Sequence, residues 1–351
     1  MVDPEQLSRD LSAAVHGVGP DGFGQMIADA VGKWVAFDAV RLVCTNPASV
    51  LALGSFSCWH RYDRDLLEAL VLDRFRGGDP CRPEDLVGRQ APVGIVDVAD
   101  DRGSRARCTG ELLAAHGVHC ELRALLRDRS GVWGFLGLAR EYGARPFDHQ
   151  DVERITRLGP ILAKAIREFA RDCSLVPAAP ALRPGVFTIG PDHRVRGVTS
   201  DAQAWFARLW MPEERGVLDW VATPFAEELS MRIRARVGAC REDKPLICAS
   251  VAGAGRWIAV HGQLLDSAGA DDIAVVIQAA RGDVLLPSFC HWYGITARER
   301  SVLELLCRGE SPRMIAKALD LSAHTVNDHL KSIYRKTAAD GRDELLAAVT
   351  T

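Results

Sequence analysis

Several features that would define a class of protein at once are missing from this sequence. No stretch of about eighteen apolar residues occurs, and the first five residues carry acids rather than a basic segment followed by an apolar one. We therefore expect a cytoplasmic protein with no membrane partner. The formal net charge is only -3, so the whole molecule has no field that would attract nucleic acid, and any DNA binding must depend on a local surface.

The ten cysteines include no C-x-x-C pair. Zinc sites need ligands at short spacings, and disulfide-based folds are short secreted chains, so we expect most of these thiols to be small buried groups in a reducing compartment. Cys44, Cys58 and Cys120 lie on or beside expected strands and would be redox-active only beside a cation that lowered their pKa. We expect core packing instead.

One cluster, His116-x-x-His119-Cys120, offers imidazole and thiolate donors of the kind that bind haem iron or a metal. No other residue converges on these three, so we expect ordinary surface or half-buried side chains, with no cofactor and no metal. The chain also lacks the G-x-S-x-G, Walker A and H-E-x-x-H signatures. We expect no enzymatic activity, with Cys-based redox chemistry as the alternative.

At 351 residues, 48% of them hydrophobic, the chain is long enough for two or three domains. A Pro- and Ala-rich stretch at 171–184 predicts a linker between an N-terminal domain, 1–170, and a central domain, 185–280. In the first domain the sequence predicts the following elements: a helix at 20–35, strands at 39–45 and 50–59, a helix at 63–75, an irregular stretch at 76–110, a hairpin of 121–127 with 133–140, and a helix ending near 169.

That last helix should begin at Asp148-x-x-Asp151, and its apolar residues recur at spacings of three and four. The resulting stripe suits packing on its own sheet or a seam against a second copy; its members are Ile155, Leu158, Leu162, Ile166 and Phe169. The central domain should contain two strands around 190–192, helices at 201–209 and 225–237, and strands at 246–251, 256–265 and 273–279. We therefore expect two α+β domains in succession.

The C-terminal segment, 291–351, has the clearest helix boundaries. Thr296-x-x-Glu299 is a capping box, Ser311-Pro312 opens a second helix, and Ser322 caps a third that should run to about Thr337. A fourth short helix should cover 342–349. Short capped helices separated by tight turns predict an all-α, four-helix unit built around a helix-turn-helix.

The third of these helices has two different faces. Val326, Leu330, Ile333 and Tyr334 should anchor it to the first two helices, and Met314 should belong to the apolar face of the second. The opposite face is polar and cationic towards its end, and we expect it to contact DNA; its residues are His324, Thr325, Asn327, Asp328, Lys331, Ser332, Arg335 and Lys336. Lys and Arg pair with phosphates, while Asn327 and Asp328 could read adenine and cytosine edges. The alternative is a solvated face of a small helical bundle.

These residues resemble the LuxR-type helix-turn-helix family over about fifty-five positions, from Gly294 to Val349. The segments that carry the resemblance are Ile295-Thr-Ala-Arg-Glu-Arg300, Val302-Leu-Glu-Leu-Leu306, Gly309, Ile315-Ala316, Leu319 and Leu321-Ser-x-His-Thr-Val326 with His329-Leu330. The resemblance implies a recognition helix in the major groove of double-stranded DNA. It also implies DNA contacts by Asn327, Asp328 and Lys331, and a fourth helix that often forms the dimer contact.

Two positions depart from the family pattern. Many members carry Lys or Arg where this chain has Asn327, and the usual Leu-Gly-hydrophobic turn after Lys336 is replaced by Thr337-Ala-Ala-Asp-Gly341. Between His291 and Thr351 there are nine Lys or Arg and eight Asp or Glu, a net of +1. A monomer so weakly basic would have little non-specific affinity for DNA, so we expect a homodimer on a two-fold site.

The order of elements before this unit is similar to a GAF-like domain followed by a PAS-like domain, a layout of actinobacterial LuxR-type regulators. A phosphorylated receiver does not fit, because the acidic cluster Asp97, Asp100 and Asp101 lies far into the chain in an expected irregular segment. An acyl-homoserine-lactone domain would leave a shorter chain. The resemblance implies a pocket for a small-molecule effector in 1–170, with a dimerisation or partner-binding scaffold as the alternative.

Overall fold

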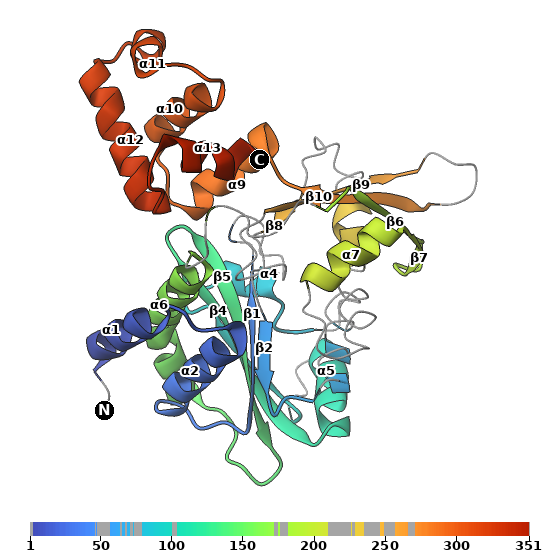
Figure 1. The fold of residues 1–351 in the computed structure, drawn as a ribbon. Helices are drawn as coiled ribbons and strands as arrows, with labels where there is room; N and C mark the ends of the chain where they lie inside the picture. Colours follow the sequence, from blue (N-terminus) through green and yellow to red (C-terminus); the bar gives the residue numbers. More distant parts are fainter. Residues whose placement is uncertain are drawn as a thin grey trace.

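The computed structural model contains two antiparallel five-stranded sheets and a carboxyl-terminal group of helices (Figure 1). It describes residues 3–45, 47, 57–63, 65–66, 69–70, 73, 79–99, 104–171, 175, 182–209, 226, 229–234, 246–248, 257–265 and 271–350. Among these residues, no helix combines the length and the apolar character needed to cross a membrane.

The first sheet has the strand order β2-β1-β5-β4-β3, and its central strands are the longest. Its strands are β1 (Ala39–Cys44), β2 (Ser57–His60), β3 (Val93–Asp97), β4 (Val118–Asp128) and β5 (Gly131–Glu141). The hairpin β4–β5 is as predicted but longer. Helices α1 (Pro4–Ala14), α2 (Pro20–Gly32) and α6 (His149–Arg171) form a layer on one side of this sheet, while α5 (Ser104–Ala115) lies on the other (Figure 1).

The prediction of an irregular stretch at 76–110 was wrong. Within it lie α4 (Pro83–Val87), β3 and the start of α5 (Ser104–Ala115). Strand β3 has five residues and contains Gly94, and α5 is only weakly amphipathic, so neither shows a clear period in the sequence. Helix α1 was also not predicted. The predicted helix at 63–75 and much of the strand at 50–59 lie outside the described residues.

The apolar stripe of α6 packs on its own sheet. Ile155, Leu158, Leu162 and Ile166 are completely buried and share one core with residues of β4 and β5. Asp148 caps the helix by accepting hydrogen bonds from the backbone amides of residues 150 and 151. The stripe is therefore covered within one chain, which excludes the alternative that it forms a seam with a second copy.

The second sheet has the order β7-β6-β10-β9-β8 and lies beside helix α7 (Ser200–Leu209). Its strands are β6 (Gly185–Ile189), β7 (Val195–Val198), β8 (Leu246–Cys248), β9 (Ile258–Leu264) and β10 (Ile273–Ala279). Trp205 of α7 is fully buried against Phe187, Ile258 and Val275 of the sheet. These strands and α7 match the predicted element order. Most of the predicted helix at 225–237 lies outside the described residues.

Helix α9 (Gly282–Trp292) joins the second sheet to the last four helices, and it also contacts the first domain. The Trp292 ring lies edge-on to Trp133 of β5, at 4.9 Å, and to Trp257, at 5.3 Å. Arg171, the last residue of α6, donates a hydrogen bond from Nη2 to the Trp292 carbonyl oxygen. Burial, reinforced by the neighbouring charge of Arg167, lowers the pKa of Arg171 to about 10. The guanidinium therefore remains charged at neutral pH.

Candidate DNA-binding interface

The last four helices are α10 (Ala297–Cys307), α11 (Pro312–Leu319), α12 (Ala323–Thr337) and α13 (Arg342–Thr350). The caps that the sequence predicts are present. Thr296 and Glu299 form the capping box of α10, and the hydroxyls of Ser311 and Ser322 accept from the amides of residues 314 and 325. Asp320 adopts a left-handed conformation, with φ of 52°, and this turns the chain sharply between α11 and α12.

One face of α12 anchors it to the two preceding helices. Val326 and Ile333 are completely buried and Leu330 is nearly so, in the same core as Leu306 and Ile315 of α10 and α11. These buried positions recur every three or four residues, so the opposite side of α12 must face away from the bundle. Tyr334 is half-buried, as expected for the edge of this face.

The predicted face of α11 was partly wrong. The sequence pattern predicts Met314, Ile315, Ala318 and Leu319 for this face. Ile315 is buried as predicted and Leu319 is half-buried, but Met314 is 52% exposed, Ala318 is also exposed, and Ala316 packs in the core. In an eight-residue helix, a rotation of one position brings a different pair of residues inward, and the sequence pattern alone does not fix that rotation.

The outward face of α12 places most of the predicted DNA-contacting residues in solvent. The side chains of His324 and Lys331 are 85% and 77% exposed, and Asn327 and Arg335 are also exposed. Asp328 lies between the two cationic positions, with Oδ2 3.4 Å from His324 Nε2 and Oδ1 4.0 Å from Lys331 Nζ. Thr325 is half-buried, and its hydroxyl is 2.8 Å from that of Ser322 at the helix start.

Two of the predicted residues lie against α10 instead. Lys336 Nζ donates to Glu299 Oε2 at 2.6 Å, and Ser332 also bonds to this carboxylate. Glu299 accepts from the Thr296 amide at 2.7 Å as well, and its side chain is only 6% exposed. Burial acts to raise the pKa of Glu299, but the bonds from Lys336, Thr296 and Ser332 outweigh it and lower the pKa to about 2. The ionised carboxylate thus fastens α12 to α10.

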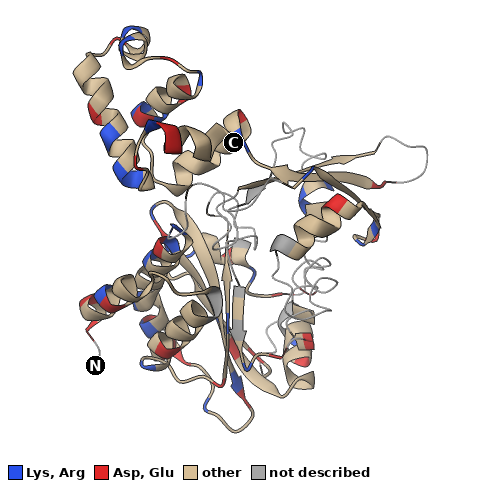
Figure 2. Ribbon diagram, viewed as in Figure 1, with Lys and Arg blue, Asp and Glu red and all other residues tan. Residues whose placement is uncertain are grey.

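The role of Glu299 beyond its own cap was missed by sequence reasoning. The capping box accounts for Glu299 locally, but its partner Lys336 is 37 residues away, and no sequence period links the two. Figure 2 marks basic residues in blue on α11 and along α12, with acidic residues in red among them. With Lys336 and Glu299 paired, the cations free to meet phosphate on α12 are fewer than the sequence suggests.

The first domain holds a buried group of charges on the sheet face opposite α6. Glu121 Oε1 accepts from Tyr62 Oη at 2.6 Å and lies 3.0 Å from Arg41 Nη2, while its Oε2 accepts from Arg123 Nε at 2.7 Å. Arg123 also donates to Asp79, and its Nη2 is buried without a hydrogen-bond partner among the described residues. Burial acts to raise the pKa of Glu121, but the charges of Arg123 and Arg41 reverse this and lower it. The network is neutral and holds a carboxylate ionised inside the domain.

The histidines and cysteines singled out in the sequence do not converge. His116 Nδ1 lies 2.5 Å from Asp63, and His119 Nε2 lies 3.7 Å from Asp97. No group of three metal-binding side chains occurs in the part of the chain that the structure describes. Cys44 and Cys120 are buried, and burial raises the pKa of the Cys120 thiol, the opposite of what a reactive thiolate requires.

Comparison with known proteins identifies the family to which the carboxyl-terminal helices are similar. Residues 294–349 match the family described as bacterial regulatory proteins of the luxR family. The chain is 40% identical, over 53 residues, to the monoamine regulon transcriptional regulator of Klebsiella aerogenes, which is 15% of this chain and 23% of that protein. These helices are therefore a helix-turn-helix domain of LuxR type, and the matched segment spans about a quarter of the curated relative.

Among solved structures, the chain is similar to the N-acylhomoserine lactone-dependent LuxR family transcription factor CepR2 from Burkholderia cenocepacia. That match has 17% identity and a TM-score of 0.32, over 48% of this chain and 92% of that one. It is also similar to SdiA from Escherichia coli, with 13% identity and a TM-score of 0.30, over 99% of this chain and 90% of that one. Similarity at this level does not establish the fold family or the function of the domains that precede α9.

Proposed function

We propose that this protein is a transcription regulator that binds operator DNA through the exposed face of α12. The observation that carries the proposal is the polar face itself: Asn327, Asp328, Lys331 and Arg335 lie exposed on one capped helix whose other side is locked into the bundle. A helix presented in this way can enter the major groove, where side chains meet base edges and phosphates together. The match of this segment to LuxR-type regulators supports the same function.

Different residues of α12 would have different tasks. Asn327 and Asp328 would read bases, whereas His324, Thr325, Lys331 and Arg335 would contact the phosphate backbone around them. Ser332 and Lys336, both bonded to Glu299, would act as positioning residues that fix the tilt of α12. The net charge of only +1 over 291–351 supports binding as a homodimer, because two copies double the number of phosphate contacts.

The domains before α9 would form the controlling part of the regulator. We assign 1–170 as a GAF-like domain, 171–184 as a linker, 185–280 as a PAS-like domain and 291–351 as the DNA-binding domain. Two antiparallel sheets with accompanying helices, one after the other along the chain, support this assignment. The contacts of α9 with Trp133 and Arg171 support a route by which a small-molecule signal in the first domain would reach the helix-turn-helix.

Selection of bound fragments from a random DNA library, followed by footprinting, tests the proposal. We expect one enriched site with two-fold symmetry. Asn327→Ala should then change preference at one base position of each half-site, at a cost of about 1–3 kcal/mol, whereas Lys331→Ala should weaken binding to all sequences alike. If the library yielded no enriched site, or if neither substitution altered binding, α12 would not be the DNA-reading element.

A further inference from the structure

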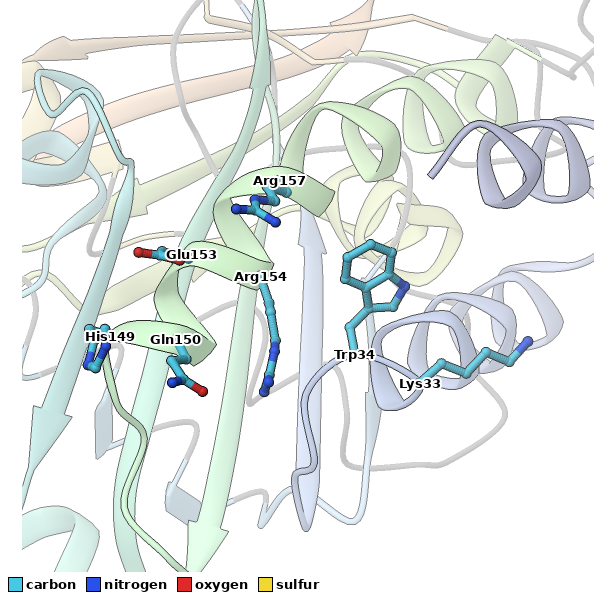
Figure 3. Close-up of a pocket in the computed structure, with 7 residues that line it drawn as sticks. All are labelled: Lys33, Trp34, His149, Gln150, Glu153, Arg154 and Arg157. Atoms are coloured by element: carbon cyan, nitrogen blue, oxygen red, sulfur yellow. The ribbon is translucent and has the colours of Figure 1, made fainter. Parts of the chain in front are cut away.

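A groove of about 490 Å³ lies between the end of α2 and the first turns of α6. Its volume falls within the range of about 300–1,000 Å³ that is usual for small-molecule sites. Figure 3 shows the two contributing segments, with the Trp34 ring facing the α6 turns that carry Arg154 and Arg157. The lining residues are Lys33, Trp34, His149, Gln150, Glu153, Arg154 and Arg157.

The groove carries a surplus of positive charge. Buried Asp151 is within 3.1 Å of Arg140 and 3.2 Å of Arg145 on one oxygen, and within 3.3 Å of Arg154 on the other. Asp148 also pairs with Arg145, so two carboxylates face these three guanidinium groups and one positive charge is left over. Arg157, three residues after Arg154 and so nearly one turn further along α6, adds to this excess.

Two more cations of the lining, Lys33 and Arg157, are not held in an ion pair among the described residues. Glu153 is the single acid in the lining. Such a group of guanidinium and ammonium donors is suited to a phosphate, which accepts charge-assisted hydrogen bonds from several of them at once.

Trp34 gives the groove a flat apolar wall. The residue is half-buried and packs on the core of the first domain, so the ring is held in place. Its Nε1 is buried and has no hydrogen-bond acceptor among the described residues. A fixed indole beside cationic side chains is a combination that binds an aromatic base by stacking while the cations hold its phosphate.

We propose that this groove binds a nucleoside phosphate, with the base against Trp34 and the phosphates on Arg154 and Arg157. The inference rests on the sensing role proposed above for residues 1–170. The groove lies on α6, whose far end bonds to α9 through Arg171. Because ligand binding is measured without DNA, failure of this proposal and failure of the DNA-binding proposal are separate results.

Isothermal titration of the full chain with ADP tests the site, with adenosine and inorganic phosphate as the two halves of the ligand. We expect saturable binding of one ADP per chain, and each half should bind at least tenfold more weakly. Arg157→Ala and Trp34→Leu should each weaken ADP binding at least fivefold. Arg9→Ala, which removes an exposed arginine of α1, is the matched control and should change nothing.

Loss of ADP binding in the Arg157→Ala and Trp34→Leu variants could also result from misfolding. Glu153→Gln avoids this ambiguity, because removing the single acid of the lining should tighten ADP binding two- to fivefold, and a misfolded protein would not bind more tightly. Three results would overturn the proposal: no saturable binding of ADP, equal binding of ADP and inorganic phosphate, or a Glu153→Gln variant that binds ADP no better. An Arg157→Ala variant that altered DNA binding but left ADP binding intact would also overturn it, since the groove would then serve DNA.

Discussion

Replacing Glu299 with Gln tests whether the ionised carboxylate holds α12 in place. The pKa of Glu299 is lowered from 4.5 to about 2 in the folded protein. A group whose folded pKa is depressed stabilises the fold above its unfolded pKa and loses that effect as the pH falls towards the folded value. The difference corresponds to roughly 3 kcal/mol as an upper bound. Because Lys336 is 25% exposed and can be rehydrated, we expect Glu299→Gln to cost about 2 kcal/mol at pH 7.

Hydrogen exchange of the full chain, followed by mass spectrometry of peptides from α10 and α12, measures this loss locally. A cost of about 2 kcal/mol should speed exchange in both helices about thirtyfold. Glu304→Gln is the matched control: its exposed pair with Arg300 should contribute only about 0.3–0.5 kcal/mol. The wild-type protein should also lose protection in these helices between about pH 4.5 and pH 2. Equal effects of the two substitutions, or protection unchanged over that pH range, would refute the reasoning.

Three further substitutions test other parts of the structure. Ala338→Gly should raise the stability of the C-terminal helices by about 1 kcal/mol, because Ala338 ends α12 in a left-handed conformation with φ of 57° that favours glycine; local hydrogen exchange checks this, and a destabilised variant would contradict it. Asp151→Asn should lower the free energy of unfolding of the first domain by about 3–5 kcal/mol, because it leaves buried Arg140 unpaired; urea denaturation measures it, and a neutral result would show that the charge is not needed. Arg171→Met removes the hydrogen bond to the Trp292 carbonyl and should weaken the contact between α9 and the first domain. We therefore expect faster proteolysis between the first domain and α9. Unchanged cleavage would show that this hydrogen bond does not hold α9 against the first domain.

The parts of the fold that the sequence predicts well depend on local chemistry. The caps at Thr296, Ser311 and Ser322 are hydrogen bonds between residues three apart, and the apolar spacing of α6 and α12 fixes which face is buried. Both sets of contacts are visible in the order of residues alone. For the same reason five of the eight residues predicted for the exposed face of α12 are exposed; they are His324, Asn327, Asp328, Lys331 and Arg335.

What the sequence could not show depends on contacts between distant residues. The sequence predicts that Lys336 contacts DNA, but in the structure its ammonium group donates to Glu299 of α10. Arg41, Glu121 and Arg123 lie on strands and would be expected in solvent, but each is more than 90% buried. Glu121 and Asp79 together neutralise the two arginines. Neither the linear spacing nor the residue type predicts such pairs.

Salt dependence of DNA affinity tests the central claim most directly. On the site recovered by selection, the logarithm of the binding constant should fall linearly with the logarithm of salt concentration. Lys331→Ala should reduce that slope by about one for each Lys331 in the complex, so by about two for a dimer. Lys164→Ala, on α6, should leave the slope unchanged. A slope that Lys331→Ala did not alter would show that the exposed face of α12 does not bind the DNA backbone.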